Sequence, residues 1–171
     1  KKLLPDQDFY FDAVPDAMRY MVLMDGCHRW RPFVLKQCVG LLGFEPGSLA
    51  YDKIATVAGV AIELIHNYSL IHDDLPQMDD DGTRRNQESC HMKFGDGIAM
   101  LAGSALIFRA FGVMSSIEEE YDANKILRII HTIAEYSGSH GLIQGQSVDI
   151  MILGDIECTE EEYQMLTRVH L

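Results

Sequence analysis

One apolar stretch with helical spacing constrains the fold of this chain more than any other feature. Between residues 48 and 74 the apolar side chains recur every three or four positions, at Ile54, Val57, Ala58, Ala61, Leu64, Ile65, Leu70 and Ile71. Such a stripe predicts one long helix with a buried face. The helix runs into an acidic segment, His72–Arg85, which holds five aspartates within nine residues.

Helical patterns also dominate the rest of the chain, and alternating strand patterns are scarce. Together with that helix, at 52–74, helices are predicted at about 10–26, 30–43, 97–119, 122–138 and 139–153, with a last one starting at a capping box formed by Thr159 and Glu162. The chain shows no strong linker. The pattern therefore predicts a single all-α domain over residues 1–171.

The net charge of −12 argues against two classes of partner. An acidic chain repels nucleic acid and anionic membrane surfaces, so neither is expected. The apolar run 98–114 is shorter than the ~20 residues that span a bilayer, and it contains Arg109, so it predicts a buried core helix rather than a membrane span. No signal peptide is evident, which favours a cytoplasmic protein. Both ends, Lys1 and Leu171, look cut.

The five aspartates repel one another, and they follow a helix whose C-terminal end already carries partial negative charge. A bound cation would relieve this repulsion. Magnesium prefers oxygen ligands and usually takes one or two carboxylates together with substrate phosphates. The acidic segment therefore predicts a Mg²⁺ site that also receives a phosphorylated substrate.

Three other interpretations of the acidic segment stay open. A plain solvated loop leaves the two arginines after it unexplained. A calcium-binding EF-hand fits at four of five defining positions, but Gln77 stands where the first aspartate belongs, and Arg84 and Arg85 would oppose the ion. A cap for the following helix needs one aspartate rather than five.

The acidic segment resembles the first aspartate-rich motif of the trans-isoprenyl diphosphate synthases, in its DDxxxxD form followed by two arginines. Other pieces of that family's pattern occur in the same order: Arg29–Pro32, Ile65–Asp74, His91–Gly95, Leu101–Gly103, and Gly145–Gln146 with Asp149. The likeness extends from about residue 16 to 171. It implies the isoprenoid synthase helical bundle around a central cavity, seen here as its N-terminal part, and a homodimer by analogy.

The resemblance also implies roles for individual residues. Asp73 and Asp79 would be the catalytic magnesium ligands, with Asp74 beside them, and Arg84 would bind the allylic diphosphate. The other implied substrate-binding residues are His28, Arg31, His66 and Arg85, for isopentenyl diphosphate, and Gln146, which would face the cavity.

By this resemblance the chain condenses isopentenyl diphosphate with dimethylallyl or geranyl diphosphate to give farnesyl diphosphate. In that reaction the magnesium ions assist ionisation of the allylic diphosphate. Tyr68 and Ser69, just before Asp73, would set product length, with the Tyr68 ring as a floor near fifteen carbons. The five-residue offset also turns Tyr68 ~140° from Asp73, so packing against a neighbouring helix or subunit is the alternative.

Departures from the family pattern leave two rival functions. His28 replaces the usual lysine of GGKRLRP, and Ser104 replaces the aspartate of LAGDAL. Both substitutions favour a non-catalytic subunit of a heteromeric synthase, whereas the retained DDxxxxD and arginines oppose it. A geranylgeranyl diphosphate synthase is the nearest alternative by product. The second aspartate-rich motif is absent, so the 171-residue chain alone is expected to be inactive.

Overall fold

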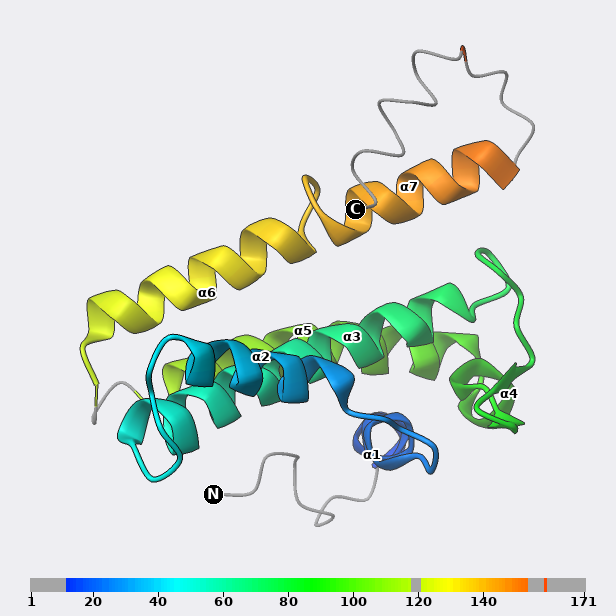
Figure 1. Cartoon of the computed structure of the whole chain (residues 1–171). Coiled ribbons are helices and arrows are strands. Elements are labelled where there is room, and N and C mark those ends of the chain that lie inside the picture. Colours follow the sequence, from blue (N-terminus) through cyan, green and yellow to red (C-terminus); the bar gives the residue numbers. More distant parts are fainter. Residues whose placement is uncertain (1–11, 118–120, 154–158, 160–171) are drawn as a thin grey trace. The chain divides into compact units, whose positions relative to one another are not determined.

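The computed structural model describes residues 12–117, 121–153 and 159 (Figure 1). They are mainly helical, which confirms the predicted all-α class. The chain divides into two compact units, residues 1–121 and 122–171. The single domain over the whole chain stays a prediction.

Two long helices form the centre of the first unit. Helix α3 packs along α5, α2 lies on α3, and α1 and α4 pack against α5 (Figure 1). The bounds are α1 Ala13–Leu23, α2 Trp30–Leu41, a π-helical turn η1 Ala50–Ile54, α3 Ala55–Asp73, α4 Cys90–Phe94 and α5 Asp96–Ser115. The core side chains between them include Ala61, Leu64, Ile71, Ala102, Leu106 and Ala110. The predicted helix over 52–74 is thus confirmed as a core element.

Two glycines allow the helices to come close to α3. A Cβ on Gly59 of α3 would lie 3.1 Å from Cβ of Pro32, at the start of α2. A Cβ on Gly103 of α5 would overlap the imidazole ring of His72, near the end of α3. Small residues at these two points therefore set the distance of α2 and α5 from α3.

A β-hairpin that the sequence patterns do not predict follows the acidic segment. Strands β1 (Thr83–Arg84) and β2 (Gln87–Glu88) pair antiparallel. Arg85 and Asn86 form the two-residue turn with φ of 54° and 62°, the signs of a type I′ turn. Such turns are usually signalled in the sequence by Asn-Gly or Asp-Gly. Here arginine occupies the first turn position, so the usual signal is absent. The Tyr20 hydroxyl donates to the Glu88 carbonyl at 2.7 Å and joins the hairpin to α1.

The second unit contains helices α6 (Ala123–Ser137) and α7 (Leu142–Leu153). The side chain of Asp122 caps α6 by accepting from the backbone N–H of Asn124 at 3.0 Å. The helices predicted at 122–138 and 139–153 are therefore confirmed. The last predicted helix, after Thr159, lies outside the described residues.

Two helical stretches among the described residues, Ala50–Asp73 and Asp96–Ser115, are long and apolar enough to cross a membrane by length and composition alone. Core helices of water-soluble proteins pass the same test, so this is weak evidence for a membrane protein. In the first unit the two stretches pack on each other. The second stretch contains the run 98–114, for which a core helix was predicted.

Candidate functional site

The C-terminal end of α3 brings the first and last aspartates of the DDxxxxD motif together. The chain turns after Leu75, and the backbone N–H of Asp79 donates to the carbonyl of Asp73 at 2.9 Å. The Asp73 side chain is half-buried and that of Asp79 is exposed. Asp80 then takes a left-handed backbone conformation, with φ of 52°, and leads the chain away towards the hairpin.

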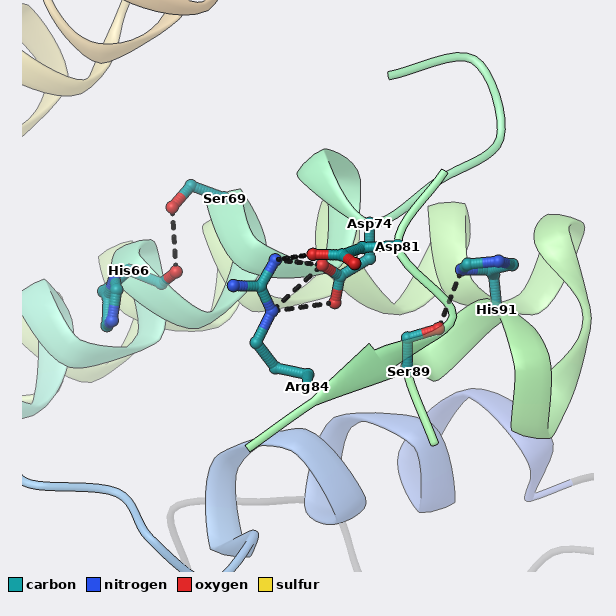
Figure 2. Close-up of polar contacts among 7 residues, drawn as sticks. All are labelled: His66, Ser69, Asp74, Asp81, Arg84, Ser89 and His91. Carbon is teal, nitrogen blue, oxygen red and sulfur yellow. Dashed lines mark hydrogen bonds and ion pairs between the residues drawn. The ribbon is translucent and has the colours of Figure 1, made fainter. Parts of the chain in front are cut away.

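The middle aspartate, Asp74, is held by an arginine. Its side chain is fully buried, and Arg84 Nε donates to both carboxylate oxygens, at 3.0 and 3.2 Å, while Nη2 also donates to Oδ1 (Figure 2). The exposed carboxylate of Asp81 lies 3.7 Å from the same guanidinium. Burial raises the pKa of Asp74 above its usual range and the Arg84 bond opposes this, while Asp74 raises the pKa of Arg84. Arg84 is therefore fixed in place as a permanent positive charge.

These contacts bear on which oxygens are open to magnesium. Among the described residues no three His, Cys, Asp or Glu side chains converge to form a metal site by themselves. Two carboxylates at one helix end, from Asp73 and Asp79, fit an ion that takes its remaining ligands from water and substrate phosphate. The assignment of Asp74 as a third ligand stays a prediction, because both of its oxygens accept hydrogen bonds from Arg84.

The second arginine of the hairpin points to another part of the unit. Arg85 Nη1 lies 2.7 Å from the Cys27 sulfur, so the hairpin turn touches the segment between α1 and α2. His28 comes directly after Cys27 and is exposed, as is Arg31 in the first turn of α2. The neighbouring arginines of one hairpin therefore contact two different segments.

His66 lies on α3 among these positive charges. The pKa of His66 is lowered to about 4, mainly by burial and next by the positive charge of Arg31, with smaller effects from Arg85 and Arg84. Glu63 acts in the opposite direction. His66 is therefore neutral at pH 7 and offers a ring N–H without adding positive charge.

The predicted chain-length residues lie on different sides of α3. The Tyr68 ring is buried, and its edge contacts the ring of His72 one turn on, with centroids 5.5 Å apart. His72 in turn contacts α5, with Nε2 3.2 Å from the Met100 carbonyl. The ring contact of Tyr68 is with a residue of its own helix, so its role in chain length stays a prediction. Ser69 is half-buried, and its hydroxyl donates to the His66 carbonyl at 2.9 Å (Figure 2).

Sequence reasoning missed two polar residues beside this site. Glu63 is buried and pairs with Arg29, at 2.8 Å between Oε1 and Nη1. His91 is buried near Asp74, and its Nδ1 lies 3.0 Å from Ser89 Oγ (Figure 2). A lone acid on the buried stripe of an apolar helix was the available signal for Glu63. Gln146 lies on α7 in the second unit, and its role stays a prediction.

Comparison with known protein families agrees with this arrangement. The sequence model of the family described as Polyprenyl synthetase matches residues 12–169. The chain belongs to that family. The EF-hand interpretation loses its basis, since half of the twelve-residue loop it requires, from Gln77 to Glu88, folds as the β-hairpin.

Named relatives of this polyprenyl synthetase chain include a farnesyl diphosphate synthase from Haemophilus influenzae, 41% identical over 136 residues, which are 80% of this chain and 43% of that protein. A chloroplastic geranylgeranyl pyrophosphate synthase from Catharanthus roseus is 36% identical over 80% of this chain and 36% of its own length. The crystal structure of an FPP/GFPP synthase from Zymomonas mobilis superposes with a TM-score of 0.85 at 32% identity, covering 98% of this chain and 58% of that one. The chain thus spans about half the length of these relatives.

Proposed function

We propose that this polyprenyl synthetase chain is part of a trans-prenyltransferase that joins isopentenyl diphosphate to dimethylallyl or geranyl diphosphate and forms farnesyl diphosphate. The similarity to a synthase of that name from Haemophilus influenzae supports the product. The whole reaction belongs to the complete enzyme, of which this chain supplies the first aspartate-rich motif and the segment around Arg31.

One observation carries the proposal. The two arginines that follow the acidic motif lie on one hairpin, and their guanidinium groups contact different parts of the unit. Arg84 bonds Asp74, the second aspartate of DDxxxxD, whereas Arg85 touches Cys27 next to His28. A reaction between two diphosphate substrates requires two anion-binding regions close together, and this arrangement supports that requirement.

The allylic diphosphate would bind where α3 ends. Magnesium held by Asp73 and Asp79 would supply Lewis-acid assistance to the departure of the diphosphate. Arg84 adds a fixed positive charge at that place, already oriented by Asp74. Because the guanidinium is oriented before substrate arrives, little reorganisation is needed when negative charge develops on the leaving group.

The isopentenyl diphosphate would bind against Arg31, Arg85 and the neutral His66. His28, where the family pattern has lysine, adds a charge only when it is protonated. The ring N–H of His66 donates a hydrogen bond to phosphate and adds no positive charge to the group of arginines. No nucleophilic side chain is needed, since these residues bind, orient and exclude water.

A product longer than fifteen carbons is the second candidate. The similarity to a geranylgeranyl pyrophosphate synthase favours it. We further propose that the complete enzyme is a cytoplasmic homodimer without a membrane span. A non-catalytic subunit stays the alternative suggested by His28 and Ser104.

The test uses the complete enzyme with radiolabelled isopentenyl diphosphate, each allylic diphosphate in turn, and magnesium. We expect a prenyl diphosphate product that disappears when magnesium is chelated. Diphosphate binding without turnover would overturn the proposed activity in favour of a partner subunit. In that case, His28→Lys tests whether the missing lysine is the cause.

A further inference from the structure

The segment that carries His28 and Arg31 contains a strained residue. Arg29, between them, has a left-handed backbone conformation, with φ of 54° and ψ of 36°. A residue with a Cβ adopts this conformation rarely and at an energetic cost, so the surrounding structure must hold it there. Helix α2 begins at the next residue, Trp30. The direction in which α2 presents Arg31 therefore depends on the conformation of Arg29.

The side chain of Arg29 is tied at two points. Its Nη1 donates to Oε1 of Glu63 on α3 at 2.8 Å, and its Nη2 donates to the carbonyl of Val22 in α1. The Glu63 side chain is buried, whereas that of Arg29 is 37% exposed, so the pair is part-buried and is screened less by salt than a fully exposed pair. One guanidinium thus links the segment before α2 to two other helices.

Glu63 also lies at the right place along α3. It precedes His66 by three residues, about one helical turn, and its negative charge acts on the His66 ring. Within the described residues, Glu63 Oε2 and Oδ1 of the fully buried Asn67 have no hydrogen-bond partner. The bond from Arg29 to Oε1 therefore satisfies one oxygen of the buried Glu63 carboxylate.

We propose that Glu63 is a positioning residue for isopentenyl diphosphate. Through Arg29 it holds the segment 27–31 so that His28 and Arg31 face the same diphosphate as His66 and Arg85. Arg29 itself does not touch substrate, because its guanidinium is engaged by Glu63 and Val22. The identity of the substrate in this inference rests on the proposed function. The contact by which Glu63 holds segment 27–31 through Arg29 does not depend on the reaction.

The first test separates positioning from mere stability. In the complete enzyme, Glu63→Gln should raise KM for isopentenyl diphosphate by about tenfold or more, with KM for the allylic substrate and kcat changed little. Arg29→Met should give the same pattern, and the double variant should be no worse than either single one. Glu45→Gln, an exposed glutamate between α2 and η1, is the matched control and should leave both KM values unchanged.

The second test does not depend on turnover. Cys27 lies in the held segment and contacts Arg85, so its labelling rate with a thiol reagent reports how firmly that segment is held. Glu63→Gln should raise the labelling rate of Cys27 several-fold, while that of the exposed Cys38 stays constant. Unchanged Cys27 labelling in an otherwise folded variant would overturn the inference. An inactive parent enzyme with faster Cys27 labelling in the variant would overturn only the proposed function.

Two results of the kinetic test on Glu63→Gln would also overturn the positioning role of Glu63. One is an equal rise in both KM values, and the other is a fall in thermal stability with both KM values unchanged. Either result would mean that Glu63 supports the fold generally rather than one substrate site. Arg29→Lys adds a conservative comparison. Lysine keeps the charge but cannot reach Glu63 and Val22 together with a planar fork, so partial recovery relative to Arg29→Met is expected.

Discussion

Arg84 grips Asp74 through Nε and Nη2, and the carboxylate that it grips is fully buried. The contact makes Asp74 the residue that orients an arginine, although it stands in the motif whose carboxylates are proposed to bind magnesium. Asp73 and Asp79 are joined instead through the backbone, by the bond from the Asp79 N–H to the Asp73 carbonyl. The neighbouring aspartates Asp73 and Asp74 therefore make different contacts, Asp74 through its side chain to Arg84 and Asp73 through its backbone to Asp79.

The first prediction concerns Asp74. Asp74→Asn leaves the part-buried Arg84 guanidinium without its charged partner, which costs about 1–3 kcal/mol of unfolding free energy. Urea unfolding followed by circular dichroism measures this loss. Asp81→Asn is the control, since Asp81 is exposed and 3.7 Å from the same guanidinium, and it should cost at most about 1 kcal/mol. Full stability of Asp74→Asn combined with loss of magnesium binding would mean that Asp74 is a metal ligand after all.

The second prediction concerns the carboxylates assigned to magnesium. Asp73→Asn or Asp79→Asn should lower kcat of the complete enzyme by about 10²–10³ and raise the magnesium concentration needed for half-maximal rate. Stability should hold or increase, because one repelling charge is removed at a helix C-terminus. Asp80→Asn, an exposed neighbour, should keep the rate within about twofold. A comparable loss of kcat in all three variants would contradict the assignment of Asp73 and Asp79, because it would mean that the total negative charge matters rather than particular carboxylates.

The third prediction concerns the contact between α3 and α5. Gly103→Ala places a methyl group against the His72 ring, so it should cost about 1–3 kcal/mol of stability. Gly112→Ala lies on the same helix, where an added Cβ meets nothing within 4 Å, and it should be neutral or stabilising by up to about 1 kcal/mol. Thermal unfolding of the two variants side by side tests this. A stable Gly103→Ala would mean that α5 shifts without cost.

The fourth prediction concerns pH. His66 has a pKa of about 4 in the folded chain, below its ordinary value of 6.5, so the unfolded chain binds its proton first as the pH falls. The unfolding free energy should therefore decrease from pH 6.5 towards 4, and His66 contributes nothing to a change above pH 7. His66→Gln should flatten this part of the curve, measured by urea unfolding at half-unit steps. Equal slopes for parent and variant would contradict the low pKa.

Among the described residues, sequence patterns predicted the long helices but not the short helix α4, Cys90–Phe94. The stripe through Ala61, Leu64 and Ile71 needs only helical spacing to be recognised, and α6 begins at a capping Asp122. The hairpin at 83–88 was not predicted, because its type I′ turn uses Arg85 and Asn86 instead of a glycine-containing pair such as Asn-Gly.

The polar side chains were harder to predict than the elements that carry them. The family resemblance singled out Asp73, Asp79, Arg84 and Arg85 as candidates, yet it does not say which side chain each arginine contacts. That choice depends on the hairpin, which turns Arg84 to Asp74 and Arg85 to Cys27. Pairs formed by residues far apart in sequence, such as Glu63 with Arg29, follow from tertiary packing and leave no local pattern.

Product analysis tests the central claim most directly. The complete enzyme receives isopentenyl diphosphate with geranyl diphosphate and magnesium, and the products are dephosphorylated and separated by chain length. We predict a fifteen-carbon alcohol from the parent and a longer one from Tyr68→Ala, whose smaller side chain removes the proposed floor. No prenyl product at any magnesium concentration, with diphosphate binding intact, would contradict the account.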